Sequence, residues 1–266
     1  RSVNAVMAEA ILPVTDYLEV DLAVRYDNYD DFGSEVSPRV GATFTMIDNL
    51  VVKASYGQGF RAPDLSDLYG ATSFSAEDAK DYYGCSLDGI SEADCPNRQF
   101  DTYIGSNPDL EAETSETMSF GVEYTYDNNW VAKVNYVTLE LQNANEYVSA
   151  QDMLNVDRNT GGNNPQVDRN SLGAVTEIRA GYQNAVNDVQ RQSVDLALDG
   201  TIHESDDYGT FGFRGEATKY LKFETETEFG SGILGDAVDT LGFPEWRSSA
   251  LISWTMGNWG ANISTS

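Results

Sequence analysis

The sequence is poor in histidine and in basic residues, and both shortages restrict its chemistry. His203 is the single histidine, so a Ser-His-Asp or Cys-His catalytic set, or a multi-histidine zinc site, has only this residue to draw on. Sixteen Lys and Arg residues stand against 43 Asp and Glu residues, which gives a formal net charge of −27. Phosphate backbones would repel so acidic a chain, and nucleic acid is therefore excluded as a partner.

Long hydrophobic runs are also missing, and proline is scarce. No stretch approaches the roughly 18 consecutive apolar residues of a membrane-spanning helix. Seven prolines accompany 23 glycines and 15 tyrosines, a composition that favours strands and turns over helices. Apolar residues make up 41% of the chain, enough for an ordered protein. The sequence opens on Arg1 without a signal peptide, so we expect a mature or truncated piece.

Cysteine is limited to Cys85 and Cys95. Their close spacing in a loop-like stretch predicts a disulfide in an oxidising compartment, which would stabilise the loop by about 2–3 kcal/mol. The alternative is a pair of unpaired buried thiols. Polar neighbours such as Gly84 and Asp88 disfavour that alternative, because free cysteines are usually buried among apolar residues.

Alternation of apolar and polar residues with a period of two dominates the chain. In the clearest segment Met118, Phe120 and Val122 share one parity, while Ser119 and Glu123 belong to the other. Successive side chains of a strand point to opposite faces, so such a segment has one apolar and one polar face. The pattern predicts about ten strands, near residues 3–12, 17–28, 36–47, 50–58, 114–126, 130–141, 175–200, 209–220, 246–256 and 259–266.

The connections between these strands alternate in length. Short turns such as 13–16, 48–49 and 257–258 separate longer links. Strands of roughly ten residues with short turns on one side and long loops on the other are typical of transmembrane β-barrels. The sequence therefore predicts an all-β, antiparallel transmembrane barrel with short periplasmic turns. The predicted extracellular loops are 29–35, 59–113, 142–174 and 221–245.

The positions of the aromatic and charged residues agree with a barrel wall that has one face toward lipid and the other toward the lumen. Aromatic side chains flank the short turns and would form the periplasmic girdle, where amphipathic rings prefer the headgroup region. The apolar parity should contact lipid, and the polar parity should face the lumen. The girdle residues are Tyr17, Tyr126, Trp130, Trp254 and Trp259, and the lumen charges are Arg25, Arg39, Lys53, Glu123 and Lys133.

Two motifs resemble the TonB-dependent outer-membrane receptor family. Residues 56–69, YGQGFRAPDLSDLY, are similar to the strand-to-loop signature of that family. Residues 107–115, NPDLEAETS, lead into SFGVEY at 119–124 and resemble its NPxLxxExS…xxGxEY motif. The two motifs stand in the family's order, separated by a long loop that contains the cysteines, and the resemblance extends over essentially the whole chain.

The resemblance implies a 22-stranded barrel filled by an N-terminal plug domain, of which this chain supplies about ten strands. By the same resemblance, the protein lies in the outer membrane of a Gram-negative bacterium, among lipid and lipopolysaccharide. Its loops would capture a scarce solute of the siderophore, cobalamin or oligosaccharide class. Uptake would be driven by TonB through the plug, which is absent here, and no enzymatic activity or cofactor is expected.

Candidate ligand contacts surround the cysteine loop and a second loop with a short internal echo. Aromatic residues near the cysteines could stack on a ligand or pack a small core of the loop itself. The echo, VDRN at 156–159 and at 167–170, places two arginines on an acidic surface, where they could contact an anion or neutralise neighbouring aspartates. The candidates are Tyr82, Tyr83, Arg98, Arg158 and Arg169.

The sequence leaves two further hypotheses to consider, which are a metal site and membership of another class of protein. His203 lies among acidic residues that favour a solvated turn over a metal site, and the acidic stretch 27–33 lacks the later acidic residue of a calcium loop. A self-contained ten-stranded outer-membrane enzyme would need a catalytic dyad at the extracellular rim. A secreted β-sandwich would bury Leu22 and Phe120 against a second sheet.

Overall fold

The computed structural model describes the whole chain except residues 128, 186–187 and 232. These positions lie outside the described residues. They belong to the connection between the predicted strands 114–126 and 130–141, to the predicted strand 175–200 and to the predicted loop 221–245. No helix in the described part of the chain is both long and apolar enough to cross a membrane.

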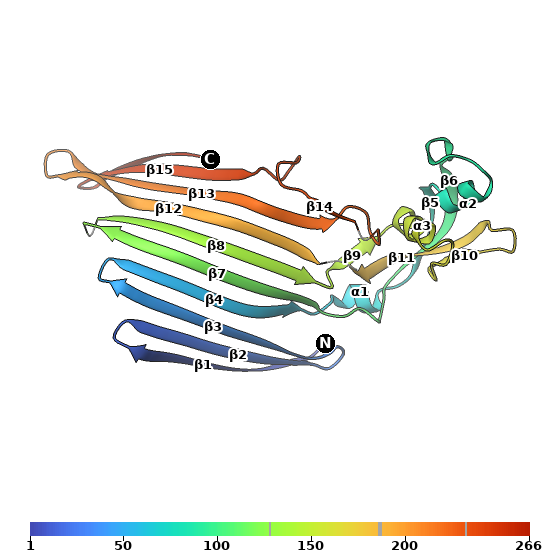
Figure 1. Cartoon of the computed structure of the whole chain (residues 1–266), viewed down its shortest axis with the longest axis horizontal. Helices are drawn as coiled ribbons and strands as arrows, with labels where there is room; N and C mark the ends of the chain where they lie inside the picture. The colour runs from blue at the N-terminus through green and yellow to red at the C-terminus, as the bar shows by residue number, and fades with distance from the viewer. Residues whose placement is uncertain (128, 186–187, 232) are drawn as a thin grey trace.

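One large antiparallel sheet contains most of the strands (Figure 1). Within the described residues it has eleven strands in the order β1-β2-β3-β4-β7-β8-β12-β13-β15-β16, with β14 paired to β13. The predicted all-β, antiparallel barrel-type fold is confirmed. The strands are β1 (Val3–Thr15), β2 (Leu18–Tyr29), β3 (Gly33–Ile47), β4 (Leu50–Arg61), β7 (Glu113–Tyr126), β8 (Trp130–Gln142), β12 (Val189–Ser205), β13 (Gly209–Glu226), β14 (Leu234–Asp236), β15 (Trp246–Met256) and β16 (Trp259–Thr265).

The apolar parity of this sheet is open to its surroundings. Leu22 is 42% exposed and Phe120 is 53% exposed, and Phe44 and Ile252 are similarly accessible. In the part of the chain that the structure describes, no second sheet covers them, which contradicts the β-sandwich alternative. An apolar face of this extent in water would be costly, whereas hydrocarbon solvates it without penalty.

The opposite face carries the predicted lumen charges, which form ion pairs across neighbouring strands or along one strand. Glu123 on β7 accepts from Lys53 on β4 at 3.2 Å and lies 3.4 Å from Lys133 on β8. Arg25 forms two hydrogen bonds with Asp27 two residues along the same strand. Cross-strand pairs of opposite charge contribute a few tenths of a kcal/mol each and fix the register of a sheet.

Two predicted connections differ from the structure. The predicted loop 29–35 is a three-residue turn, 30–32, because β2 and β3 stay paired up to Tyr29 and Gly33. The predicted strand 175–200 is two strands in different sheets, β11 (Val175–Asn184) and β12, so the link after β8 extends well beyond residue 174. The first error concerns where the strands end. The second arises because alternation locates strands but does not say which strands pair.

A compact module built from two long links lies beyond one end of the large sheet (Figure 1). We call residues 62–112 and 143–188 the loop module. It contains a second sheet in the order β10-β11-β6-β5, with β9 on β11, and a core centred on Leu154 and Ile178, both fully buried. Its elements are α1 (Leu65–Tyr69), β5 (Ser73–Ala79), α2 (Tyr82–Leu87), the 3-10 helix Glu92–Asp94, β6 (Arg98–Gly105), β9 (Asn145–Val148), α3 (Ala150–Asn159), β10 (Val167–Arg169) and β11.

Candidate functional site

The two links of the loop module are joined into one sheet by backbone pairing. Strand β6 of the first link runs parallel to β11 of the second, with Thr102 opposite Ile178 and Gly105 opposite Gly181. Helix α3 packs its buried Met153 and Leu154 on this sheet. Its start is fixed by a capping box between Ser149 and Asp152, which satisfies two backbone N–H groups that would otherwise lack acceptors.

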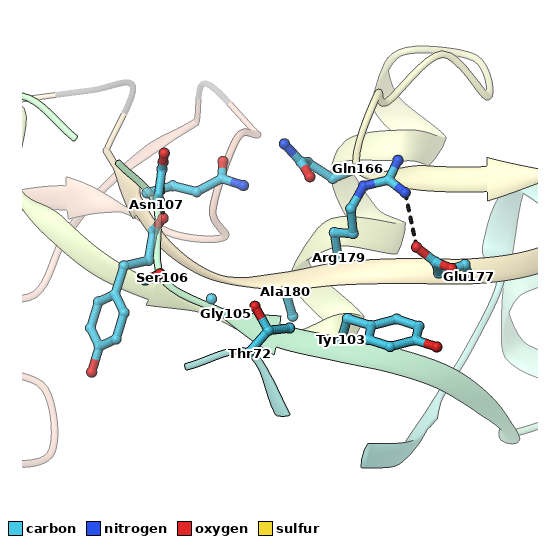
Figure 2. A pocket seen from close by; sticks show the side chains of 12 residues that line it. Thr72, Tyr103, Gly105, Ser106, Asn107, Gln166, Glu177, Arg179 and Ala180 are labelled. Atoms are coloured by element: carbon cyan, nitrogen blue, oxygen red, sulfur yellow. Dashed lines mark hydrogen bonds and ion pairs between the residues drawn. The ribbon is translucent and has the colours of Figure 1, made fainter. Parts of the chain in front are cut away.

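A groove of about 350 Å³ crosses the β6–β11 junction (Figure 2). Its floor is backbone, because Gly181 has a φ of +136° and a side chain there would collide with the carbonyl of Gly105. Aromatic and neutral hydrogen-bonding side chains surround this floor, a combination that suits small-molecule recognition. The side chains include Thr72, Tyr103, Ser106, Asn107, Gln166, Tyr182 and Gln183.

Arg179 is the cation of this groove. Its guanidinium donates to Glu177 at 3.0 Å (Figure 2). It also donates to Asp168 at 2.7 and 3.0 Å and to the carbonyl of Pro165 at 2.7 Å. These contacts neutralise its charge and fix its direction. The groove therefore presents neutral polar groups and aromatic faces more than net charge.

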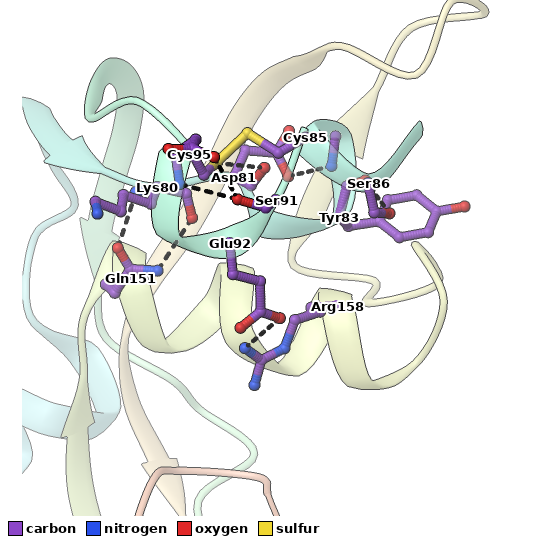
Figure 3. Close-up of a disulfide and its surroundings, with 12 residues drawn as sticks. Lys80, Asp81, Tyr83, Cys85, Ser86, Ser91, Glu92, Cys95, Gln151 and Arg158 are labelled. Atoms are coloured by element: carbon purple, nitrogen blue, oxygen red, sulfur yellow. Dashed lines mark hydrogen bonds and ion pairs between the residues drawn. A yellow bond between two sulfur atoms is a disulfide. The ribbon is translucent and has the colours of Figure 1, made fainter. Parts of the chain in front are cut away.

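The predicted disulfide is present. Cys85 within α2 is joined to Cys95, which directly follows the 3-10 helix (Figure 3). Gln151 of α3 ties this part to the rest of the module, donating to the carbonyl of Lys80 at 3.1 Å and accepting from the Lys80 N–H at 2.8 Å. The disulfide therefore closes a small loop whose base is fixed to α3.

Removing this disulfide should loosen only the loop that it closes. In a Cys85→Ser/Cys95→Ser double variant, opening of residues 86–94 is expected to become easier by about 2–3 kcal/mol, because the unfolded segment regains loop entropy. Hydrogen exchange on the purified protein measures this opening. Treatment of the wild type with a reductant should reproduce it, and unchanged exchange in 86–94 in both samples would contradict it.

Arg169 lies in the interior of the module, where it joins three elements. It donates to Asp157 of α3 at 2.8 and 2.6 Å, to Asp81 at 2.8 and 2.6 Å, and to the carbonyl of Gly173 at 2.7 Å. The ring of Tyr83 lies over the guanidinium at 4.9 Å. All five N–H donors are used, so the structure supports the charge-neutralising alternative for Arg169 over contact with a ligand.

Asp81 has two tasks in this cluster. It accepts from the N–H of Gly84 at 2.9 Å, which caps α2, and it receives Arg169. Burial alone would raise the pKa of Asp81, but the hydrogen bonds from Arg169 and Gly84, with the charges of Arg169 and Arg98, lower it. Because the pKa of Asp81 is lower in the folded protein than its ordinary value of 3.8, its ionised form stabilises the fold. This stabilisation is complete above about pH 3.8 and is lost as the pH falls through the folded-state pKa.

The other predicted contact residues do not line the groove. Arg158 pairs with Glu92 at 3.3 Å (Figure 3). It also pairs with Glu228 at 3.5 Å, and its guanidinium lies over the ring of Tyr82 at 5.4 Å. Arg98 lines a hollow of about 160 Å³ beside the disulfide. Their role in ligand binding stays a prediction.

The groove residues of β11 were missed because the sequence assigned them to a barrel strand. Arg179 and Tyr182 lie within the segment 175–200 that alternation predicted as one strand. Gly181 was the available signal, since a glycine inside a strand often marks a close backbone approach.

The acidic and histidine candidates have ordinary structural surroundings. His203 lies in strand β12, with no turn at its position, and it is exposed. In the stretch 27–33, Asp27 binds Arg25, Asp30 accepts from the N–H of Ser2, and Asp31 pairs with Arg1. Among the described residues, no group of three or more His, Cys, Asp or Glu side chains is placed to hold a metal ion.

Glu146 on β9 lies in an unfavourable electrostatic position. Burial raises its pKa, and the negative charges of Glu226, Asp152 and Glu113 raise it further. An ionised Glu146 therefore costs stability. Because the pKa of Glu146 is higher in the folded protein than its ordinary value of 4.5, the loss of stability begins near pH 4.5. It is complete once the pH has risen through the folded-state pKa.

Replacing Glu146 by glutamine should stabilise the loop module at neutral pH. The Glu146→Gln protein is expected to resist limited proteolysis within 143–185 better than the wild type at pH 7.5, because the repulsion between ionised carboxylates is gone. At pH 4 the two proteins should behave alike, since the carboxyl group is then protonated. Glu111→Gln, at an exposed position, is the matched control, and an equal effect of both substitutions would argue against the explanation.

The described geometry defines a class of protein: the wall of a membrane β-barrel that carries a structured loop module at one end. The family model for the TonB-dependent receptor-like β-barrel matches residues 1–266, and the chain belongs to the TonB-dependent receptor family. Members of this family are outer-membrane β-barrel proteins. The predicted family resemblance is confirmed.

Individual relatives match parts of the chain. The ferric enterobactin receptor PirA of Pseudomonas aeruginosa is 30% identical over 126 residues, which are 45% of this chain and 14% of that protein. The vitamin B12 transporter BtuB of Photobacterium profundum is 29% identical over 86 residues, which are 31% of this chain and 14% of the transporter. These names describe receptors and transporters.

Solved structures share the fold at low sequence identity. The siderophore receptor PirA from Acinetobacter baumannii superposes with a TM-score of 0.67 at 16% identity, over 98% of this chain and 32% of that one. The RagAB peptide transporter gives a TM-score of 0.60 at 13% identity, over 98% and 33%. The chain thus spans about a third of the length of these structures.

Proposed function

We propose that this chain forms part of the wall and ligand-capturing loops of an outer-membrane receptor that takes up a scarce solute with energy from TonB. The observation that supports this most strongly is that the chain combines two features. The large sheet has an exposed apolar face, and the loop module at the end of that sheet has a polar and aromatic groove. The sheet suits insertion into lipid, and the groove suits capture of a small solute.

The proposed partners follow from this arrangement. The apolar face contacts outer-membrane lipid and lipopolysaccharide, the loop module contacts the solute, and TonB acts through a plug domain of the complete receptor. The named relatives make ferric enterobactin and vitamin B12 the first solutes to test, within the siderophore, cobalamin and oligosaccharide classes. The matched proteins are receptors and transporters, which favours transport over the enzyme alternative.

An uptake assay tests the proposal. The complete receptor is expressed in a strain that lacks its own enterobactin and vitamin B12 receptors, with and without TonB, and accumulation of radiolabelled ferric enterobactin and cobalamin is measured. The proposal expects TonB-dependent accumulation of one of them or, if neither enters, of a panel of other siderophores and oligosaccharides. Equal uptake with and without TonB would refute the proposal, and so would recovery of the receptor in a cell fraction other than the outer membrane.

A further inference from the structure

Positive charge on this acidic chain is almost always neutralised locally. Within the described residues, twelve of the sixteen Lys and Arg side chains form an ion pair with a carboxylate. The four that do not are Lys80, Arg98, Arg191 and Arg247. Two of these four, Arg191 and Arg247, converge on a single side chain.

Tyr220 on β13 is the point of convergence. The guanidinium of Arg191, from β12, lies 4.7 Å from the centre of the Tyr220 ring and donates to its hydroxyl at 2.9 Å. The guanidinium of Arg247, from β15, lies 5.8 Å from the same ring. Two like charges on one ring repel each other, and no carboxylate among the described residues pairs with either arginine.

A β-bulge brings these side chains to one face of the sheet. Tyr220 pairs with Ser193 and Lys222 pairs with Gln192, so Leu221 is the extra residue. Three residues apart, Tyr220 and Phe223 would normally point to opposite faces, but the bulge places both on the face that carries the lumen charges. Arg191 is the register partner of Phe223, and Arg247 is the register partner of Thr218 on this same face.

The pocket beside the arginines has an apolar wall. It encloses about 190 Å³ between Arg191, Tyr220 and Arg247 and the side chains of Phe223, Val238, Phe243 and Pro244. The ring centres of Phe223 and Phe243 lie 4.8 Å apart, with the two rings tilted by 44°. An apolar cavity of about 150 Å³ accommodates a benzene ring, so this one has room for a single substituted ring.

The carboxylates of the surrounding strands do not fill the role of counter-ion. Asp195, on the same face of β12, accepts from the hydroxyl of Thr218 at 2.6 Å. Glu245, which precedes β15, pairs with Lys219 at 3.1 Å, and Lys219 stacks on Trp246 on the opposite face of the sheet. Within the described part of the chain the two arginines thus lie beside an apolar wall without a carboxylate partner.

We propose that Arg191, Tyr220 and Arg247 form a binding site for an organic anion that carries a negative group on a flat, apolar ring. The guanidinium donors would bind the negative group, for which their planar geometry is suited, and the ring would lie against Phe223 and Phe243. The site lies on the lumen face of the sheet, at the ends of β12, β13 and β15 that connect to the long loops, and it is separate from the groove of the loop module. It rests on the proposed function and adds a second place where a solute could bind.

Salicylate and its neutral amide, salicylamide, test the site in the detergent-solubilised complete receptor. Saturation-transfer NMR should detect binding of salicylate and at least tenfold weaker binding of salicylamide, because the charge-assisted hydrogen bonds are lost. An Arg191→Gln/Arg247→Gln variant should lose at least tenfold in affinity for salicylate. Lys219→Gln, on the same strand and the opposite face, is the matched control and should leave the affinity unchanged.

The outcomes separate this inference from the proposed function. Equal binding of salicylate and salicylamide, or undiminished affinity in the double variant, would overturn the site. Full displacement of salicylate by an equal concentration of inorganic phosphate would overturn the role of the apolar wall. Tyr220→Phe keeps the ring and should weaken binding less than the double variant, which provides a test if the double variant folds poorly. The assay requires neither TonB nor transport, so its failure leaves the uptake experiment to decide the function.

Discussion

Replacing Arg169 by alanine is expected to destabilise the loop module by about 3–5 kcal/mol and to leave the strands of the large sheet intact. The side chain of Asp157 is fully buried, and that of Asp81 is 14% exposed. Without Arg169 both carboxylates lose their counter-ion in a site with little access to water. Breaking a buried pair in this way is costly because the remaining charge is left uncompensated.

Hydrogen exchange of the complete receptor measures this prediction segment by segment. Peptides from 62–112 and 143–188 should exchange faster in Arg169→Ala, and peptides from β7 and β8 should not change. Arg179→Ala is the matched control. Arg179 is also an arginine of the second sheet with two carboxylate partners, but its side chain is 40% exposed, and a loss below about 1 kcal/mol is expected. Equal effects of the two substitutions would contradict the argument.

Replacing Phe120 by arginine is expected to impair assembly of the barrel, with a cost of about 2–4 kcal/mol. Phe120 belongs to the exposed apolar parity of β7 and lies six residues before Tyr126 at the turn end of the strand. At a rise of about 3.3 Å per residue and a tilt near 45°, that places it about 14 Å from the turn, near the middle of an apolar band about 25 Å tall. An arginine there would meet hydrocarbon.

The yield of folded receptor in the outer membrane, judged by its migration on unheated gels, measures this effect. Thr117→Arg is the matched control, because Thr117 lies on the same strand and points to the lumen face opposite Gly57. Its yield should stay close to that of the wild type. If Thr117→Arg were the more damaging substitution, the assignment of the two faces would have to be reversed.

The large sheet could be predicted from the sequence because its two faces meet different surroundings. Alternation in segments such as 114–126 follows from lipid on one side and water on the other, and the structure has β7 at Glu113–Tyr126. The short turns located the hairpins, and the periplasmic position of the aromatic residues beside them stays a prediction. These signals are local, so they survive without knowledge of the tertiary structure.

The loop module could not be predicted in the same way. Its sheet depends on a parallel contact between β6 and β11, which are more than 70 residues apart, and no local pattern specifies such a pairing. Arg169 shows the same limit. Its sequence environment, VDRN, allowed contact with an anion or with aspartates, and only the positions of α2 and α3 decide between them. The bulge at Leu221 is another example. Strict alternation from Tyr220 would place Phe223 on the opposite face of the sheet, and the extra residue places it on the same face.

The parallel β6–β11 pairing has a mechanical consequence. The two long links are attached to the barrel wall at four points, just after β4 and β8 and just before β7 and β12. Since backbone hydrogen bonds and the core around Leu154 and Ile178 unite them, neither link can swing away without breaking that sheet. Motion at the mouth of the barrel would therefore be a rigid tilt of one body about four short tethers, and a deletion in either link would disable both.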